Sequence, residues 1–398
     1  MKTIGVIFGG RSVEHEVSVI TGMQIVENID KSKYKVLPIY IDKDGKWLVG
    51  KSLEDFRTYK DNDFSKTSEV YFKIEYGNNN LYVKGTSEVE AGGLFKKSSV
   101  KVDTLSVYDS VDVAVLALHG TNGEDGTVQG LLETIGIPYS GPEVLGSSAG
   151  MDKVVMKDVY KQNEIPVVNY TWFYRTDWQE DREAVLERIE SKLSYPLFVK
   201  PSNLGSSIGI SRATDRETLI EAIEVAASYF KKVIIEEAVQ NPREINCAVL
   251  GYENNLETSL LEEPIGWKDI LTFEDKYINS NNKGTKKGGE RRNIPADLPE
   301  HIVSEIERLA KLSFKVLDCS GTARIDFLID ENEQVYVNEI NTIPGSMGFY
   351  LWEKKGIDFK ELISRLIEIA LINDESKKSN MYKYDSGLYN KTSYGAKI

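Results

Sequence analysis

Cysteine, histidine and long apolar runs are all scarce in this chain. Its 398 residues include two cysteines and three histidines. Two cysteines, Cys247 and Cys319, are too few for a disulfide framework or a Cys-rich metal site, so we expect buried, reduced thiols. No run approaches the roughly 20 apolar residues of a membrane-spanning helix, and residues 1–6 enter a strand-like segment without the features of a secretory signal. We therefore expect a cytoplasmic protein with no membrane partner.

Positive charge is in the minority. The chain has 49 Lys and Arg against 62 Asp and Glu, giving a net charge of -13 and a pI near 5.0. This acidic balance argues against a surface that binds nucleic acid. Any nucleotide site must therefore supply its own positive charge from lysine, arginine or a metal ion. With 41% hydrophobic residues, the composition is that of a globular protein, and the length predicts two or three domains.

The first third reads as an α/β domain, predicted to span residues 1–148. A strand at 4–8 ends in Gly9-Gly10, a helix follows from about Val17, and another strand lies at 36–40. This order opens a doubly wound domain with a parallel sheet, whose ligands gather at the carboxyl ends of the strands. Residues 55–108 predict an antiparallel excursion with a hairpin turn at 77–80, after which the apolar run 111–118 leads to His119.

Two further domains are predicted, at 149–240 and 241–373. The first has a helix at 151–162, a strand at 196–200, a Gly/Ser loop, a helix at 216–229 and a strand at 233–237. The second has a polar loop at 279–293, a helix at 299–316, strands at 322–329 and 334–341, and a helix at 359–372. Residues 374–398 are rich in Lys, Ser, Asn and Tyr without periodicity, so we expect a mobile tail.

The strand pair at 322–341 carries the most informative pattern. Side chains alternate on strands, so Arg324 and Asp326 share a face, as do Glu339 and Asn341. If the turn between the strands has an even residue count, these four side chains form one cluster. Two carboxylates and an amide suit a hard cation such as Mg²⁺ that holds a polyphosphate. The ordinary alternative is a charged sheet face, but the rigid turn after Asn341 favours a metal site.

Two loops supply candidate phosphate and catalytic groups. Residues 200–209 follow a strand with a lysine, then small residues whose N–H groups can wrap phosphate oxygens; the spacing is not that of a Walker A motif. The loop from His119 to Gly126 contains three glycines at a strand end. His119 is a candidate site residue, whereas for His15 we expect a solvated or carboxylate-paired ring.

Taken in chain order, these segments resemble the D-alanine–D-alanine ligases of the ATP-grasp superfamily. The segments that carry the resemblance are residues 9–18, 119–126, 138–141, 151–153, 200–209, 276–277, 324–326 and 338–345. The resemblance implies a three-domain ATP-grasp fold with ATP held between the second and third domains. It also implies small-molecule substrates, D-alanine and ATP, and suggests a homodimer.

The resemblance assigns a role to each matching residue. Those implied at the first D-amino acid are Glu14, Ser206 and Tyr277. Those implied at the ATP phosphates are Lys153, Lys200, Ser207 and Lys276, with Glu236, Glu237, Val239 and Glu244 around adenosine. Asp326, Glu339 and Asn341 are the implied ligands of two Mg²⁺, with Mn²⁺ as a substitute. Arg324, the N–H of Gly345 and His119 are implied near the tetrahedral oxyanion, and Ser346 at the carboxylate of the second substrate.

The implied reaction joins two D-alanines to D-alanyl-D-alanine, a peptidoglycan precursor needed for cell-wall biogenesis and cell shape. A D-alanine carboxylate attacks the γ-phosphate, and the second amine then attacks the acyl-phosphate. The loop that carries Lys276 and Tyr277 would close as a lid that excludes water.

Two departures from the family pattern leave the acceptor open. Pro344-Gly345 runs directly into Ser346, where the family has several intervening residues, and the segment 286–292 is unusually basic. A D-serine or D-lactate acceptor is therefore an alternative, although Lys276-Tyr277 disfavours the depsipeptide-forming relatives. A catalytically silent nucleotide-binding regulator would be expected to lack a metal ligand or a phosphate lysine, and this chain keeps both.

Overall fold

The N-terminal unit is built on a seven-stranded mixed sheet in the order β6-β5-β4-β3-β2-β1-β7. The computed structural model describes the whole chain apart from residues 92–97, 266–291 and 388–398. Strands β1, β2 and β7 are parallel, as predicted, and the excursion continues the same sheet with antiparallel strands. The strands are β1 (Lys2–Gly9), β2 (Tyr34–Ile41), β3 (Trp47–Val49), β4 (Ser68–Phe72), β5 (Asn80–Ala91), β6 (Ser98–Ser110) and β7 (Val113–Leu116).

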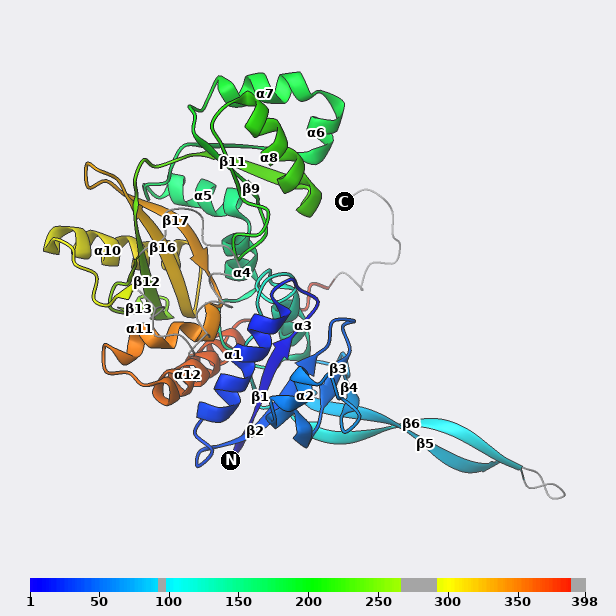
Figure 1. Ribbon diagram of the computed structural model, residues 1–398. Coiled ribbons are helices and arrows are strands. Elements are labelled where there is room, and N and C mark those ends of the chain that lie inside the picture. Colours follow the sequence, from blue (N-terminus) through cyan, green and yellow to red (C-terminus); the bar gives the residue numbers. More distant parts are fainter. Residues whose placement is uncertain (92–97, 266–291, 388–398) are drawn as a thin grey trace.

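Helices cover the parallel part of this sheet. Because β1 and β7 are covered on both faces, they are continuous apolar runs rather than alternating ones. The predicted hairpin is confirmed, since β4 pairs with β5 across residues 73–79, and the ribbon of β5 and β6 projects away from the body (Figure 1). The helical segments of this unit are α1 (His15–Asn28), η1 (Lys51–Glu54), α2 (Arg57–Lys60) and α3 (Thr127–Ile135).

The central unit is a four-stranded antiparallel sheet in the order β10-β9-β11-β8. Its strands are β8 (Tyr170–Tyr174), β9 (Leu197–Pro201), β10 (Ser211–Ala213) and β11 (Lys232–Glu237), and its helices are α6 (Arg175–Glu180), α7 (Arg182–Glu190) and α8 (Arg216–Tyr229). The helices bury residues such as Leu186 and Ile223 against the sheet. The prediction of a helix at 216–229 is confirmed.

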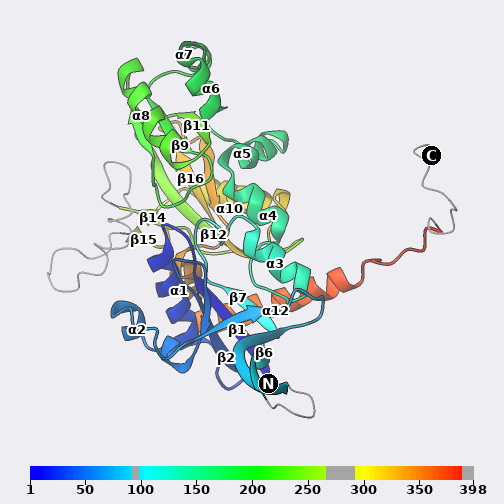
Figure 2. The ribbon, with the colours of Figure 1, turned by 90° about the vertical axis from the view of Figure 1, so that its right-hand side faces the viewer.

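Two helices lead into this unit where one was predicted. Helix α4 (Val144–Met151) ends at Asp152, whose side chain accepts hydrogen bonds from the N–H groups of Val154 and Val155 and so starts α5 (Lys153–Gln162). In Figure 2, α5 lies beside the central sheet, and α4 lies between α5 and α3. This cap fixes the position of Lys153 in the first turn of α5.

The C-terminal sheet has the order β13-β12-β16-β17 and is antiparallel throughout. Its strands are β12 (Arg243–Tyr252), β13 (Asn255–Thr258), β16 (Gly321–Ile329) and β17 (Val335–Asn341), with α10 (Glu300–Val316) on one face and the short pair β14 (Glu263–Pro264) and β15 (Arg292–Asn293) alongside. Helix α10 buries Ile306, Leu309 and Phe314 against the sheet. Cys247 and Cys319 are buried and unbonded, as expected.

The chain then returns to the N-terminal unit. It does so through η3 (Gly345–Gly348), α11 (Phe349–Glu353) and α12 (Phe359–Lys378). Leu351, Trp352 and Leu366 join the core formed by β1, β2 and β7, so this last segment ties the two ends of the chain together. Helix α12 continues to Lys378, past the predicted end at residue 372. No helix in the described ranges is both long and apolar enough to span a membrane.

Candidate active site

Two carboxylates face each other on strands β16 and β17. Asp326 lies opposite Glu339, and Arg324 lies opposite Asn341. The four side chains share one face, as predicted, but the turn between the strands, residues 330–334, has an odd count of five rather than the even count that the prediction assumed. Ile325 on the other face is fully buried. A β-bulge follows immediately, because Phe327 pairs with Val337 rather than with residue 338. This bulge shifts the register by one residue and so brings Glu339 opposite Asp326 despite the odd turn.

The Asp326 carboxylate is held by charged and polar neighbours. Arg324 donates to both of its oxygens at 2.7 and 2.9 Å, and Asn341 donates to one of them at 3.1 Å. Burial disfavours the charge of Arg324, but Asp326 more than offsets it and raises the pKa of the guanidinium. Within the described ranges, no group of three or more His, Cys, Asp or Glu side chains is arranged to hold a metal ion. Two carboxylates and an amide are the oxygen donors that suit Mg²⁺ completed by phosphate oxygens.

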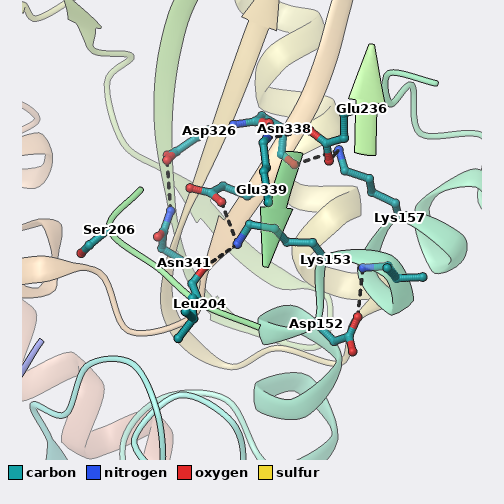
Figure 3. A network of polar contacts seen from close by, with 12 residues as sticks. Asp152, Lys153, Lys157, Leu204, Ser206, Glu236, Asp326, Asn338, Glu339 and Asn341 are labelled. Carbon is teal, nitrogen blue, oxygen red and sulfur yellow. Dashed lines mark hydrogen bonds and ion pairs between the residues drawn. The ribbon is translucent and has the colours of Figure 1, made fainter. Parts of the chain in front are cut away.

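Lys153 connects this face with the Gly/Ser loop. Its ammonium donates to the main-chain carbonyl of Leu204 at 2.9 Å and lies 3.2 Å from the carboxylate of Glu339 (Figure 3). The preceding residue, Asp152, pairs with Lys232 at 2.6 Å and anchors the start of α5 to β11. Three segments that the sequence separates by up to 186 positions therefore meet at one nearly buried ammonium group.

Glu236 lies between two buried lysines. Its Oε2 is 2.6 Å from the ammonium of Lys200, and its Oε1 is 3.1 Å from that of Lys157. Burial opposes ionisation of Glu236, but the two lysines more than offset it and lower its pKa to about 2. Burial also disfavours the charge of Lys200, while Glu236 and Glu339 raise its pKa. The cluster is thus a charged group inside the protein, at the end of the carboxylate face.

The other residues predicted around adenosine lie outside this cluster. Glu237 points to the opposite face from Glu236 because strand side chains alternate. Its carboxylate accepts hydrogen bonds from the Ser194 amide and the Asn169 side chain, both at 2.8 Å. Val239 is half-buried in the loop after β11, and Glu244 is exposed on β12. The structure therefore brings Glu236 to the lysines and turns the Glu237 carboxylate away from them.

The carboxylate of Glu14 is buried where three loops meet. The hydroxyl of Ser206 donates a hydrogen bond to it. Gly120 has a φ of +70°, and a Cβ at that position would lie 2.6 Å from one Glu14 oxygen; a Cβ on Gly205 would lie 3.0 Å from the same oxygen. Glycine is needed at both positions for the loops to approach. Ser206 and Ser207 adopt φ values of 52° and 58°, which is strained for residues with a side chain.

His119 is linked to the predicted acceptor turn through helix α1. Its Nε2 lies 2.9 Å from the hydroxyl of Thr21, and the amide of Ser346 donates to that hydroxyl at 3.1 Å. Burial lowers the pKa of His119 to about 4, against the opposing effect of a hydrogen bond with the Ile343 backbone. The ring is therefore neutral at pH 7.

The surroundings of His15 differ from those expected from the sequence. Its ring is buried and bonds the Gly10 carbonyl at 2.7 Å and the Tyr40 hydroxyl at 3.0 Å. It is thus neither solvated nor paired with a carboxylate. It holds the glycine turn after β1 in place, next to Glu14.

Glu124 is a buried carboxylate that the sequence analysis did not select. It accepts hydrogen bonds from the amides of Gly120 at 2.7 Å and Ile343 at 3.3 Å. Burial and the nearby charge of Glu14 raise the pKa of Glu124 to about 8. It therefore carries a proton at neutral pH and braces the His119 loop against the turn before Gly345. Its position inside the predicted loop from His119 to Gly126 is the sequence feature that could have identified it.

A second unselected group lies near Arg324. The hydroxyl of Tyr350 donates to Glu262 at 3.0 Å, and Arg292 pairs with Glu262 at 3.1 Å while its guanidinium lies 4.5 Å from the centre of the Tyr350 ring. Asn246, opposite Asp326 on β12, also donates to Glu262 at 2.9 Å. Burial and Glu262 raise the pKa of Tyr350, so its hydroxyl stays protonated. Nothing in the spacing of these residues predicts that they meet.

The shortened junction forms a tight left-handed turn. Ser346, Met347 and Gly348 have φ values of 51°, 54° and 62° in succession. Lys276, Tyr277 and the predicted lid segment up to residue 291 lie outside the described residues, whereas Arg292 lies within them. Apart from Lys276 and Tyr277, every predicted site residue lies within the described part of the chain.

The chain matches two family models along most of its length. The model described as D-ala D-ala ligase N-terminus matches residues 3–142, and that described as D-ala D-ala ligase C-terminus matches residues 159–368. A protein named D-alanine--D-alanine ligase from Thermosipho melanesiensis is 43% identical over 380 residues, which cover 95% of this chain and 96% of that protein. Another of the same name, from Acetivibrio thermocellus, is 41% identical over 403 residues, covering 96% and 99%.

Solved structures are similar over the same extent. The D-alanine-D-alanine ligase from Coxiella burnetii superposes with a TM-score of 0.75 at 29% identity, covering 95% of this chain and 96% of that one. VanG D-Ala:D-Ser ligase from Enterococcus faecalis superposes with a TM-score of 0.74 at 29% identity, covering 93% and 99%. The predicted three-domain ATP-grasp fold is confirmed by these likenesses.

Proposed function

Because the chain belongs to the D-alanine–D-alanine ligase family, we propose that it joins two D-alanines to D-alanyl-D-alanine at the expense of ATP, for peptidoglycan precursor synthesis. The observation that carries the proposal is the meeting of Lys153, Glu339 and the Gly/Ser loop at one point. That meeting supplies phosphate-binding charge, metal-binding oxygens and a substrate loop together. A cytoplasmic location follows from the supply of ATP there.

ATP is held by the lysines and small residues of the central unit. Lys153 and Lys200 offset the negative charge of the phosphates, together with the Ser207 region of the loop and Lys276. Glu236, Val239 and Glu244 surround the adenosine, and Glu237 contributes through its main chain. The burial of the Lys200–Glu236 pair supports this placement, because charged groups that are shielded from water are held in fixed orientations toward the substrate.

Asp326, Glu339 and Asn341 hold the divalent cations, two Mg²⁺ ions with Mn²⁺ as a substitute. When bound, these ions offset the negative charge of the phosphoryl group that is transferred from ATP. Arg324 keeps Asp326 in place through its two hydrogen bonds. The bidentate geometry leaves little freedom for the carboxylate to turn away.

The first D-alanine binds beside Glu14, Ser206 and Tyr277. Glu14 and Ser206 are already joined by a hydrogen bond, and the carboxylate can accept the ammonium of the amino acid. A carboxylate oxygen of that D-alanine attacks the γ-phosphorus, and the bond from phosphorus to the β-phosphate oxygen breaks to release ADP. The neutral ring of His119 lies close to this carboxyl group without adding charge.

The second D-alanine reacts with the resulting acyl-phosphate. Its amine, having lost a proton, attacks the carbonyl carbon, and inorganic phosphate leaves with the bonding electron pair. Arg324 and the N–H of Gly345 stabilise the oxyanion, and Ser346 binds the acceptor carboxylate. The bond from the Ser346 amide to Thr21 supports this placement, because it fixes the turn against α1.

A D-serine or D-lactate acceptor is the second candidate. The shortened turn after Gly345 is compatible with either acceptor. The likeness to a D-Ala:D-Ser ligase structure favours D-serine, whereas Lys276-Tyr277 disfavours D-lactate. A catalytically silent regulator is disfavoured, because Lys153, Lys200, Asp326, Glu339 and Asn341 are all present. A homodimer is the assembly we propose from the family alone, and sedimentation equilibrium tests it.

One incubation separates these functions. The protein is mixed with ATP, Mg²⁺ and D-alanine, alone or with D-serine or D-lactate, and ADP release and product mass are followed. We expect ADP release with D-alanine alone and a D-alanyl-D-alanine product. Absence of amino-acid-dependent ADP release would refute the ligase, and preference for a mixed product would refute the D-alanine acceptor.

A further inference from the structure

We propose that Lys157, which no role in the reaction accounts for, is a positioning residue for the nucleotide. It neutralises one side of Glu236 and thereby leaves the ammonium of Lys200 available to ATP. The inference deepens the proposed function and rests on its ATP site. It concerns how the site is prepared for the nucleotide, rather than a further contact with it.

Lys157 is a lysine with almost no access to water. It lies one helical turn after Lys153 on α5, and its side chain is 1% exposed. Its ammonium is 3.1 Å from Oε1 of Glu236 and donates to the main-chain carbonyl of Asn338 at 3.2 Å (Figure 3). Burying a lysine is costly unless its charge is paired, so the contact with Glu236 explains why a lysine is tolerated here.

The two lysines share a single carboxylate. Lys157 lies on Oε1 of Glu236, and Lys200 lies on Oε2 at 2.6 Å. Within this trio, one carboxylate between two ammonium groups leaves one positive charge in excess, which offsets part of the negative charge that Glu339 and Glu244 bring near Lys200. A positive excess is the sign that a polyphosphate requires. If Lys157 were neutral, Lys200 would be the only remaining cation on Glu236 and would be held there more strongly. Its attraction for the phosphates would fall accordingly.

The same lysine also connects α5 to the carboxylate strand. Asn338 is the extra residue of the β17 bulge, since Asp326 pairs with Glu339 and Phe327 pairs with Val337. Lys157 is bound to the carbonyl of Asn338, and Lys200 approaches its side-chain oxygen at 3.4 Å. The cluster therefore ties the central unit to the residue directly before Glu339.

The test measures nucleotide binding without turnover. Full-length Lys157→Met is titrated by calorimetry with a non-hydrolysable ATP analogue and Mg²⁺, and steady-state kinetics are measured in parallel. We expect the Kd and the KM for ATP to rise about tenfold or more, with the KM for D-alanine at saturating ATP changed less than about twofold. Lys161→Met is the matched control, because Lys161 lies one turn further along α5, is exposed, and places its ammonium 4.5 Å from the centre of the Tyr170 ring. The affinity of this variant should equal that of the unmodified chain.

A double variant distinguishes positioning from direct contact. In a Glu236→Gln background, Lys157→Met should change the Kd less than about twofold, because the carboxylate through which Lys157 acts has lost its charge. Equal, additive losses in the two backgrounds would overturn the proposal, and so would an unchanged Kd accompanied by a lower Tm. If Lys157→Met does not fold, Lys157→Arg takes its place, and the retained charge should then keep the Kd within about threefold.

The outcome also separates this inference from the proposed function. If the unmodified chain binds the analogue but makes no dipeptide, the proposed ligase activity is refuted. The role of Lys157 in nucleotide binding can still be tested by the same titration. An unmodified chain that does not bind the analogue would overturn both. Tight binding by both the unmodified chain and Lys157→Met would overturn the inference alone.

Discussion

The hydroxyl of Ser206 donates a hydrogen bond to the carboxylate of Glu14, across 192 positions of the sequence. Glu14 lies at the start of α1 in the N-terminal unit, and Ser206 lies in the Gly/Ser loop of the central unit. The bond joins the two units at one side of the site. A first substrate bound here would therefore depend on both units.

Glu14→Gln tests the first amino-acid site. The variant keeps the shape of the side chain but removes the charge that would pair with an ammonium group. We expect the KM for the first D-alanine to rise about tenfold or more, with nucleotide affinity unchanged. Glu16→Gln is the control, because Glu16 is exposed and pairs with the exposed Lys43. A first-site KM that stays at its original value in Glu14→Gln would remove Glu14 from the site.

Glu339→Gln tests the metal assignment. The variant loses a carboxylate that faces Asp326 and also the partner of Lys153. We expect kcat to fall about a hundredfold or more, with the circular dichroism spectrum retained. Glu333→Gln on the preceding turn, where the carboxylate pairs with the exposed His301, should behave as the unmodified chain. Near-normal turnover of Glu339→Gln at ordinary Mg²⁺ concentrations would contradict the assignment.

Glu124 predicts a pH dependence of stability. Its pKa rises from an ordinary 4.5 to about 8 on folding, because of burial and the charge of Glu14. A carboxyl with a raised pKa stabilises the fold fully below 4.5, and this contribution is lost as the pH rises through 8. The unfolding free energy of the unmodified chain should therefore fall between pH 5 and pH 8. In Glu124→Gln, chemical denaturation should show a fall over the same interval that is smaller by about 1 kcal/mol or more. Equal losses in the two proteins would show that Glu124 is already ionised at pH 5.

Tyr350→Phe tests the group around Glu262. The ring stays beneath Arg292, but the buried Glu262 loses a hydrogen-bond donor. We expect a loss of about 1 kcal/mol in unfolding free energy and a higher KM for the second D-alanine, since Tyr350 follows the Ser346 turn. Biphasic D-alanine kinetics separate the two sites. An increase confined to the first site would place this group elsewhere in the mechanism.

The sequence predicted those parts of the site that depend on strand alternation and local motifs. Strand alternation placed Arg324 with Asp326 and Glu339 with Asn341, but the β-bulge that aligns the two pairs across an odd turn was not visible in the sequence. The Gly/Ser loop could be placed beside a phosphate site because it follows Lys200 directly. These relationships involve neighbouring elements, so a local pattern contains them.

Contacts between distant elements could not be predicted in this way. Lys157 and Glu236 are 79 positions apart by their numbers, and only the docking of α5 on β11 brings them together. Glu262 and Arg292 meet at the pairing of β14 with β15, and Tyr350 reaches Glu262 from the helix after the shortened turn that follows Gly345. The family pattern does not contain that turn, so neither periodicity nor resemblance identified the group.

Transfer of oxygen from D-alanine to phosphate tests the central claim most directly. D-alanine labelled with ¹⁸O in its carboxylate is incubated with the protein, ATP and Mg²⁺, and the inorganic phosphate is examined by mass spectrometry. The account predicts that each phosphate released with the dipeptide carries one ¹⁸O atom, because the carboxylate oxygen that attacked the γ-phosphorus leaves with it. Dipeptide formed together with unlabelled phosphate would contradict activation through an acyl-phosphate.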